Sequence, residues 1–396
     1  MTKFGGLTIA VPREIMNGER RVAVIPQTVK KCVEAGARVL VEAGAGEMAF
    51  FEDEEYVRAG AVIVPGAPEV YQNADIILKV KEPKFNEKVG KHEVELFPEN
   101  SILICFLHPA SPANHEMIKM LAERGVTSFT LDNIPRISRA QHMDALTSMS
   151  TVAGYKSVII AAHNLSRFVP MIPTASGVIK PSQFIVVGVG VAGLQAIATA
   201  KRLGAKVKAL DIRPEANEQI RSLGAEVIPF DLPEGLGIGE GGYAKRLSAE
   251  WYSKEREVLA PHVKESDAVI LAALIPGEEA PILLDKAMVE MMKKGSVIVD
   301  ISIDQGGNCE LSRRGEEYNY QGIFISGLLN IPAYLPIDSA SMFANNIFNY
   351  LNYLVEDGKF NFKLDDELIR CPMVTKDYKI VHEGTLKAME NTITCN

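Results

Sequence analysis

Residues 184–193 read Phe-Ile-Val-Val-Gly-Val-Gly-Val-Ala-Gly, and they decide how the chain around them folds. The first four residues are typical of a buried strand, and a helical pattern follows the last glycine through Lys201. Gly188, Gly190 and Gly193 have the spacing that allows a tight turn, close approach of the backbone to a pyrophosphate, and close packing of helix on strand. The start of the helix offers unpaired N–H groups to the phosphates. We therefore predict a Rossmann-type dinucleotide site.

An acidic residue follows at the spacing that such a site requires. Asp211 lies eighteen residues after Gly193, at the end of the next predicted strand. A carboxylate there accepts hydrogen bonds from the adenosine ribose hydroxyls and repels a 2′-phosphate. The sequence therefore predicts NAD as the cofactor in preference to NADP, with Arg213, two residues further on, weakening that preference.

Apolar strands and helical stretches alternate on both sides of this turn. The strands predicted after it cover residues 207–210, 226–228, 268–271, 297–301 and 323–326. The strands and helices predicted before it cover residues 7–11, 28–35, 38–42, 76–80, 101–106 and 115–124. The expected fold class is therefore α/β, with two doubly wound, Rossmann-type parallel-sheet domains.

Two long helical patterns bracket the nucleotide-binding region, at about residues 145–165 and 339–355. We therefore expect an NAD-binding domain of residues 145–339, inserted in a discontinuous substrate domain of residues 1–144 and 340–396. The alternative is two sequential domains followed by a C-terminal tail.

The composition is that of an ordinary globular protein and argues against several classes. The chain has 396 residues, of which 47% are hydrophobic and 23% charged, and its net charge is −8. An acidic balance without a basic cluster argues against nucleic acid as a partner. No apolar run reaches the roughly 18 to 20 residues of a membrane span, and no signal region precedes the first strand. We therefore expect a cytoplasmic protein without direct membrane insertion.

The cysteines and histidines do not have the spacing of metal ligands. The five cysteines lie far apart and form no CxxC pair, which is typical of reduced thiols. The seven histidines are equally scattered. The sequence therefore predicts no metal site.

A polar segment between the two alternations reads Pro-Arg-Ile-Ser-Arg-Ala-Gln over residues 135–141, and Asp144 follows it. Considered alone, Arg136 and Asp144 would be an ion pair of a solvated loop. The segment, and with it nearly the whole chain, resembles the family of alanine dehydrogenases and nicotinamide nucleotide transhydrogenases. In the transhydrogenase branch, the part that this chain resembles is the NAD(H)-binding domain of the alpha subunit. Residues of that domain that match Arg136, Gln141 and Asp144 contact the nicotinamide, so the resemblance implies the same contacts here.

Further cofactor contacts are implied by the same resemblance. Residues 242–244, Gly-Tyr-Ala, resemble the mobile loop of that branch, which implies that Tyr243 closes over NAD(H). Without the family, residues 235–242 are typical of a flexible surface loop. Ala273 and Leu274 are also expected to bind the cofactor.

Four other positions resemble the alanine dehydrogenase branch at the places where it handles its substrate. They are Arg21 in Glu-Arg-Arg-Val-Ala, Lys81 in Lys-Val-Lys-Glu-Pro, His108 in Phe-Leu-His, and Asp304 in Asp-Ile-Ser-Ile-Asp-Gln-Gly-Gly. The resemblance implies a carboxylate-binding arginine, a substrate lysine that also takes part in catalysis, a catalytic histidine and a catalytic aspartate. Transhydrogenases usually keep the arginine but tend to lose the other three.

A turn near the end of the second alternation adds one more substrate-binding candidate. Residues 330–333, Asn-Ile-Pro-Ala, resemble an Asn-Met-Pro turn near the dehydrogenase substrate, which implies a role for Asn330. Transhydrogenases often carry an arginine just after the proline. Tyr334 departs from both patterns, and it bears on the size of the substrate.

These residue types suit reductive amination. A carboxylate substrate needs cations, which Arg21 supplies in bidentate geometry and Lys81 as a point charge. Imidazole titrates near neutral pH, so His108 can polarise a carbonyl group and shuttle its proton. Asp304 would stabilise a cationic imine. Each residue alone has an ordinary explanation, such as a solvated pair, a packed ring or a turn-forming aspartate, but their joint placement favours a function.

The sequence therefore predicts an NAD-dependent L-amino acid dehydrogenase of alanine dehydrogenase type, which converts a 2-oxo acid, ammonia and NADH into an amino acid and NAD. The alternative is the NAD(H)-binding alpha subunit, in its first portion, of a proton-translocating NAD(P) transhydrogenase, which passes hydride to NADP on a membrane-bound partner subunit. A third interpretation is an NAD-binding regulatory protein without turnover. For both enzymes the family implies a homo-oligomer, either a dimer or a hexamer.

Overall fold

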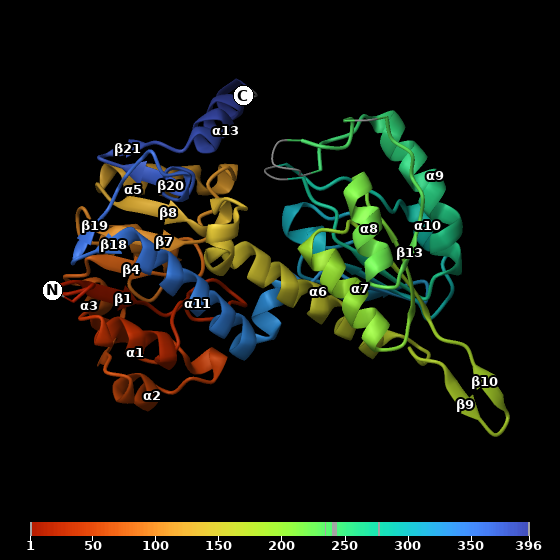
Figure 1. Ribbon diagram of the computed structural model, residues 1–396, viewed down its shortest axis with the longest axis horizontal. Coiled ribbons are helices and arrows are strands. Elements are labelled where there is room, and N and C mark those ends of the chain that lie inside the picture. The colour runs from red at the N-terminus through yellow and green to blue at the C-terminus, as the bar shows by residue number, and fades with distance from the viewer. Residues whose placement is uncertain (1, 234, 240–243, 276–277, 395–396) are drawn as a thin grey trace. The chain divides into compact units, whose positions relative to one another are not determined.

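The computed structural model describes residues 2–233, 235–239, 244–275 and 278–394. The chain divides into two compact units, which we call unit 1 (residues 1–149 and 335–396) and unit 2 (residues 150–334). Unit 1 is thus discontinuous in sequence. The first division falls inside helix α6 (Ala145–Asn164), and the second falls directly before helix α11 (Pro336–Leu354); both helices are labelled in Figure 1.

Unit 1 is built on a mostly parallel sheet with the strand order β21-β20-β8-β7-β4-β1-β2-β3. Neighbours from β3 to β8 are parallel, and β20 and β21 add an antiparallel edge. The strands are β1 (Thr8–Val11), β2 (Arg38–Glu42), β3 (Val62–Val64), β4 (Ile76–Leu78), β7 (Ile102–Cys105), β8 (Thr127–Thr130), β20 (Met373–Lys376) and β21 (Lys379–Ile380). Two small hairpins pair β5 (Phe85–Asn86) with β6 (Lys91–His92) and β18 (Val355–Glu356) with β19 (Lys359–Phe360).

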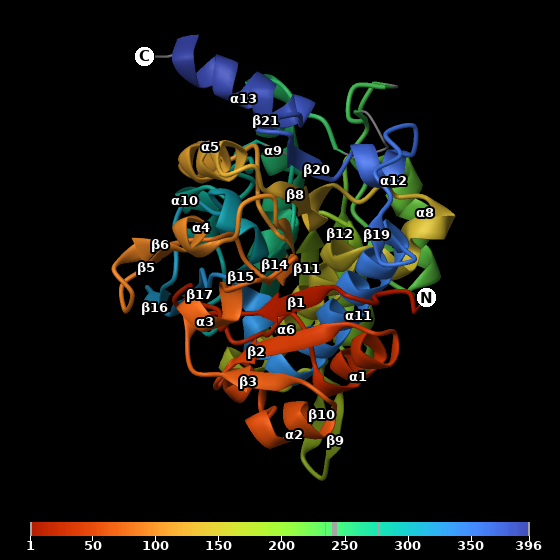
Figure 2. The same ribbon diagram turned by 90° about the vertical axis from the view of Figure 1, so that its left-hand side faces the viewer.

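Helices cover both faces of this sheet, because alternate strand residues point to opposite sides. Ile9 and Val11 face a core that includes side chains of α1 and α11, whereas Ala10 faces a core with α3 and α5. Figure 2 shows β1, β2 and β3 side by side, with α1 and α3 on either side of them. The other helices of this unit are α1 (Pro26–Glu34), α2 (Asp53–Arg58), α3 (Ala67–Tyr71), α4 (Glu93–Leu96), α5 (His115–Glu123), α12 (Glu367–Arg370) and α13 (Glu383–Thr394).

Unit 2 contains a second mostly parallel sheet, with the strand order β13-β12-β11-β14-β15-β17-β16. Only β16 runs antiparallel to its neighbour among the described strands of this sheet. The strands are β11 (Gln183–Val187), β12 (Lys206–Leu210), β13 (Glu226–Val227), β14 (Ala268–Leu271), β15 (Val297–Asp300), β16 (Glu317–Tyr320) and β17 (Ile323–Ser326). A separate hairpin of β9 (Ile172–Thr174) and β10 (Gly177–Ile179) extends away from the sheet of its unit in Figure 1.

The second sheet is also covered on both faces. Phe184 and Val186 of β11 pack in a core with α6, α7 and α8, whereas Ile185 and Val187 pack in a core with α9 and α10. The helices are α7 (Val191–Arg202), α8 (Pro214–Ser222), α9 (Ala249–Glu265) and α10 (Lys286–Glu290). The predicted fold class, two α/β parallel-sheet domains of Rossmann-like type, is therefore confirmed.

Among the described residues, no helix combines the length and the apolar character that crossing a membrane requires.

Candidate functional site

In unit 1, four ionisable residues follow the carboxyl ends of four neighbouring strands. Glu14, Lys81 and His108 each stand three residues after the end of β1, β4 and β7, and Asp132 stands two residues after the end of β8. The ladder aligns these ends, because β4 pairs with both β1 and β7, and β7 pairs with β8. Open α/β sheets bind ligands outside the carboxyl ends of their strands. This edge of unit 1 is therefore its candidate functional site.

The centre of this edge is an ion pair between His108 and Asp132. His108 Nδ1 lies 2.8 Å from Asp132 Oδ1. The second carboxylate oxygen, Oδ2, accepts from the backbone N–H of His108 at 2.8 Å and of Leu107 at 3.2 Å, and from the Thr130 hydroxyl. The carboxylate thus binds both the ring and the backbone of the histidine, which fixes the orientation of the imidazole and directs Nδ1 to Asp132.

The same pair shifts the pKa values of both partners. Removal of water lowers the pKa of His108, but the Asp132 carboxylate outweighs this effect and the net pKa is raised. Burial raises the pKa of Asp132, yet the charge and hydrogen bonds of His108 and the Thr130 hydroxyl bring it down to about 2. The imidazolium form therefore persists to a higher pH than in an ordinary histidine, while 42% of the side chain remains exposed to solvent.

His108 also has an unusual backbone. Its φ is +45°, in the left-handed region that side chains other than glycine rarely adopt. Such a conformation costs on the order of 1–3 kcal/mol and persists only where the surroundings impose it. Here Asp132 accepts the His108 N–H, and the Asn114 amide donates to the Leu107 carbonyl at 3.0 Å. The fold therefore holds this ring in place at a cost in stability, which is typical of functional positions.

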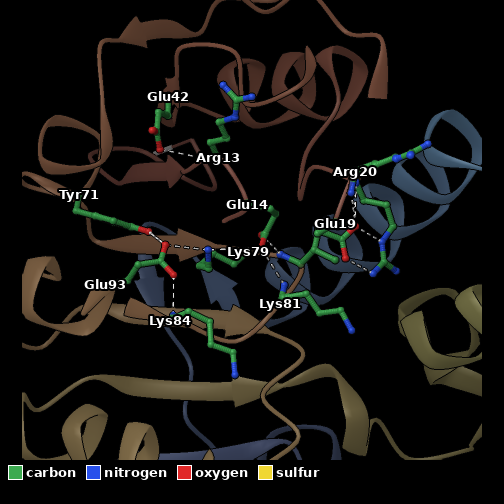
Figure 3. A network of polar contacts seen from close by, with 12 residues as sticks. Arg13, Glu14, Glu19, Arg20, Glu42, Tyr71, Lys79, Lys81, Lys84 and Glu93 are labelled. Carbon is green, nitrogen blue, oxygen red and sulfur yellow. Dashed lines mark hydrogen bonds and ion pairs between the residues drawn. The ribbon is translucent and has the colours of Figure 1, made fainter. Parts of the chain in front are cut away.

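Lys81 lies beside this pair. Its positive charge lowers the pKa of His108, so the two side chains interact electrostatically. Lys81 is partly exposed, and within the described part of the chain its ammonium group makes no hydrogen bond or ion pair. In Figure 3 its side chain points away from the buried network to which its backbone belongs. Lys81 therefore offers an available cation next to a histidine that can donate a proton.

Arg21, the third cation expected here, is occupied in a way that the sequence does not reveal. Its Nε and Nη2 atoms donate to the Glu19 carboxylate at 2.7 and 2.5 Å, and both side chains are buried. This is the bidentate geometry in which arginine binds a carboxylate. The guanidinium edge that we expected to bind a substrate is thus engaged by a neighbour two residues away.

The polar segment before α6 forms a 3₁₀ helix over Ser138–Met143. Arg136 and Gln141 are exposed. Asp144 accepts from both the backbone N–H and the hydroxyl of Thr147, at 2.8 and 2.7 Å, and so caps the start of α6. Asp144 therefore has a structural role as a helix cap.

In unit 2 the glycine turn joins strand β11 to helix α7. A Cβ on Gly188, whose φ is +84°, would lie 2.5 Å from the Ala273 nitrogen, and a Cβ on Gly193 would lie 2.0 Å from the Gly188 carbonyl oxygen. A Cβ on Gly190 would meet nothing within 4 Å. Gly188 and Gly193 are thus required by the packing of the chain itself, whereas Gly190, the N-cap of α7, borders open space in front of the helix.

Asp211 lies beside this turn, at the end of β12. Its Oδ2 accepts from the Val189 N–H at 2.7 Å, and Arg213 forms a bidentate pair with it at 2.9 and 3.0 Å. Arg213 also donates to the Val189 carbonyl at 3.2 Å. The carboxylate therefore holds the glycine turn in shape, and a cation is already paired with it.

The other expected residues of unit 2 lie in two places. Ala273 is held by Asn308, which accepts from its N–H at 3.0 Å and donates to its carbonyl at 2.9 Å; Leu274 beside it is exposed. Asp304 is exposed, and its carboxylate accepts from the Asn330 N–H at 3.3 and 3.4 Å, so the structure brings these two residues together. Tyr243 lies outside the described residues.

Two family models match the chain in succession. Residues 10–153 match the N-terminal domain, and residues 157–383 the C-terminal domain, of the model described as alanine dehydrogenase/PNT. The chain belongs to the alanine dehydrogenase/PNT family. It is therefore an oxidoreductase of a family that includes NAD-dependent dehydrogenases.

Both branches of the alanine dehydrogenase/PNT family occur among its relatives. The chain is 42% identical over 380 residues to an NAD(P) transhydrogenase alpha subunit, in its first portion, of Rhodospirillum rubrum, covering 95% of this chain and 98% of that protein. A solved transhydrogenase from Sinorhizobium meliloti matches with a TM-score of 0.80 and 35% identity, over 95% of this chain and 99% of that one. A solved L-alanine dehydrogenase matches with a TM-score of 0.79 and 29% identity, over 97% and 99%. The fold therefore does not distinguish the transhydrogenase branch from the dehydrogenase branch, and only the side chains of the site can distinguish them.

Sequence reasoning missed Asp132 and Glu14, the two carboxylates of the candidate site. Asp132 belongs to the end of β8, a strand that the apolar pattern did not reveal because Thr127, Ser128 and Thr130 are polar, although all are buried. The sequence did contain a signal for Asp132, because this carboxylate comes just after residues 126–130, a short segment rich in β-branched residues. Among the described residues, no group of three or more His, Cys, Asp and Glu side chains could hold a metal ion.

Proposed function

We propose that the chain is an NAD(H)-dependent L-amino acid dehydrogenase of alanine dehydrogenase type. It would convert a 2-oxo acid, ammonium, NADH and one proton into an amino acid, NAD and water. The observation that carries this proposal is the set Lys81, His108 and Asp132 at one edge of the unit 1 sheet. Transhydrogenation between two nicotinamides needs neither a cation for a substrate carboxylate nor an acid for a departing oxygen.

Each residue has a proposed role that its surroundings support. Lys81 binds the substrate carboxylate as a point charge. His108, kept protonated by Asp132, polarises the substrate carbonyl and donates a proton to the oxygen that leaves as water. Because Glu19 occupies the Nε–Nη2 edge of Arg21, we propose that Arg21 contributes to carboxylate binding by its charge and not through that edge. We further propose that Asp304 stabilises the cationic imine.

We propose unit 2 as the NAD-binding domain and unit 1 as the substrate domain. NADH, when bound, supplies the hydride that reduces the imine carbon. The open space at Gly190, the N-terminus of the twelve-residue helix α7, and the carboxylate of Asp211 suit the pyrophosphate and ribose of such a cofactor. The remaining residues that we propose to contact the cofactor or substrate are Gly188, Gly193, Arg136, Gln141, Asp144, Tyr243, Ala273, Leu274 and, for the substrate, Asn330.

The test is NADH oxidation by the purified chain with a panel of 2-oxo acids, with and without ammonium. We expect turnover that depends on ammonium and falls at least about 100-fold in His108→Gln. Asp267→Asn is the matched control, because Asp267 is a buried, paired carboxylate at the amino end of β14, the edge of the unit 2 sheet opposite the glycine turn. No turnover with any 2-oxo acid would refute the proposal.

The second candidate is the NAD(H)-binding subunit of a transhydrogenase. The 42% identity to the Rhodospirillum rubrum subunit favours it. In that case the partners would be membrane-bound subunits that bind NADP, and the chain would bind no small carboxylate. Hydride exchange on mixing the chain with the NADP-binding domain of such an enzyme, together with inactivity toward 2-oxo acids, would establish this candidate instead.

We also propose that the chain forms a homo-oligomer through the β9–β10 hairpin. Met171 and Val178, on or next to the hairpin, expose 58% and 63% of their surfaces, and Phe168 nearby exposes 55%. Apolar side chains on a projecting hairpin suit burial against a second copy of the chain. Light scattering should give a mass above that of one chain, and Val178→Asp should reduce it.

A further inference from the structure

A lysine is completely buried beneath the proposed substrate site. Lys79 has no exposed side-chain surface, and its ammonium lies 3.0 Å from Glu93 Oε1 and 3.5 Å from Glu14 Oε2. Both carboxylates are almost fully buried. Figure 3 shows the lysine between the two glutamates. Burying charges is costly unless they are paired and hydrogen-bonded, so these three groups depend on one another.

The two carboxylates bind the backbone that follows strand β4. Glu14 accepts from the Val80 N–H at 2.6 Å and from the Lys81 N–H at 3.4 Å. Glu93 accepts from the Lys84 N–H at 3.0 Å. After β4 ends at Leu78, backbone bonds to Ile104 and Phe106 continue as far as Val80, and beyond them these side chains hold the segment that presents Lys81.

The network carries more negative than positive charge. One lysine faces two glutamates, and burial raises the pKa of Glu14 to about 7, even though the Lys79 charge lowers it. Glu19 and Glu93 raise the Glu14 pKa further by like-charge repulsion. The other titratable groups around the network are Glu42, which interacts with Lys79 and Glu93, Tyr71, whose hydroxyl donates to Glu93 at 2.6 Å, and Cys105, which lies within the field of Lys79 and Glu14.

We propose that Glu14, held by Lys79, is a positioning residue that presents Lys81 to the carboxylate of a 2-oxo acid and takes up one proton when that anion binds. This inference rests on the proposed function. Its physical basis is that Glu14 holds the backbone of the residue that binds the anion, with the Lys81 backbone nitrogen 3.4 Å from Glu14 Oε2. A negative charge on Glu14 opposes an anion drawn to the Lys81 side chain by like-charge repulsion, so anion binding favours the neutral form of Glu14. The proton comes from solvent and returns to it when the product leaves.

The proposal fixes the sign of the pH dependence. A 2-oxo acid binds more tightly when Glu14 is protonated, so its KM rises as the pH increases through neutrality. Between about pH 6 and about pH 8 we expect a rise of roughly tenfold beyond the part that His108 contributes. NADH binding should not follow this dependence.

Two substitutions separate charge from position. Glu14→Gln keeps an oxygen that can accept from the Val80 N–H but removes the titrating charge, so the KM should rise much less with pH than in the parent. Glu14→Asp keeps the charge but withdraws it from the backbone, so the KM should rise about tenfold at every pH while its pH dependence persists. In both variants kcat should stay within about threefold of the parent, since Glu14 touches no reacting atom.

Asp267→Asn is again the control, because it removes a buried, paired carboxylate elsewhere and should leave the KM profile unchanged. If Glu14→Gln does not fold, Glu14→Asp and the proton uptake of the parent, measured by calorimetry in buffers of different ionisation enthalpy, decide the matter. A parent KM profile retained in Glu14→Gln, or no proton uptake in the parent, would overturn the inference. A parent without any 2-oxo acid turnover would instead overturn the proposed function.

Discussion

Replacing Asp132 by Asn tests whether this carboxylate controls the proton of His108. Three donors, the N–H groups of Leu107 and His108 and the Thr130 hydroxyl, converge on Asp132 Oδ2, while Oδ1 alone faces His108 Nδ1 at 2.8 Å. In Asp132→Asn the single amide oxygen should take the place with three donors. The amide NH₂ then faces Nδ1, which can only accept from it, so the imidazolium form loses its partner.

The expected loss is large in rate and moderate in stability. General acid catalysis contributes about 10²- to 10⁴-fold, so amination in Asp132→Asn should fall at least about 100-fold at neutral pH. The pKa of His108, raised by Asp132 in the parent, should fall in the variant. The backbone bonds at Oδ2 survive, but the ion pair that helps to bring the pKa of Asp132 down to about 2 is lost, so the free energy of unfolding at neutral pH should fall by about 2 kcal/mol.

The assay measures kcat and KM for the 2-oxo acid and for NADH across pH. The KM for NADH should not change, and His108→Gln/Asp132→Asn should be no slower than His108→Gln alone, because both substitutions remove one function. A second readout is stability: the His108–Asp132 pair contributes fully below the ordinary histidine pKa, and its contribution is lost as the pH rises through the raised pKa of His108. If Asp132→Asn keeps the parent rate and pH profile, the assignment of His108 as the acid is wrong.

Three further predictions concern unit 2. Gly190→Ala should fold normally, because its Cβ meets nothing within 4 Å, but it should weaken NADH binding at least about tenfold, as measured by fluorescence titration. Gly193→Ala, with a Cβ 2.0 Å from a backbone oxygen, should instead lower the free energy of unfolding by about 1–3 kcal/mol, as measured by thermal unfolding. Arg213→Ala should increase the preference for NADH over NADPH, seen as a roughly tenfold change in the ratio of kcat/KM values, because it removes the cation nearest Asp211. Asp304→Asn should reduce the kcat of amination at least about tenfold without changing the dissociation constant for NADH. An equal loss of kcat and of NADH affinity would contradict the proposed role.

The parts of the fold that were predictable are those that local patterns determine. The strand and helix around Gly188 follow from the spacing of three glycines, of which Gly188 and Gly193 are required by the packing of the chain. The two long helices α6 and α11 were predicted from helical periodicity. In contrast, β8 has the sequence Thr-Ser-Phe-Thr, and only tertiary burial between β7 and β20 makes these polar residues part of a core.

The site was predictable only in part, because its residues come from the ends of several strands that are neighbours in the sheet but far apart in the sequence. Lys81 and His108 could be singled out one at a time, but nothing local shows that β4 and β7 are neighbours in register. Once that register is known, the residues that control them follow: Asp132 from the next strand on one side holds the ring, and Glu14 from the next strand on the other side holds the backbone of the lysine. Both controlling residues are carboxylates beside cations, so each partner taken alone has the ordinary explanation of a structural ion pair. The order of the strands turns two such pairs into one arrangement, in which each of the two outer carboxylates sets the position of an inner cationic residue, His108 or Lys81.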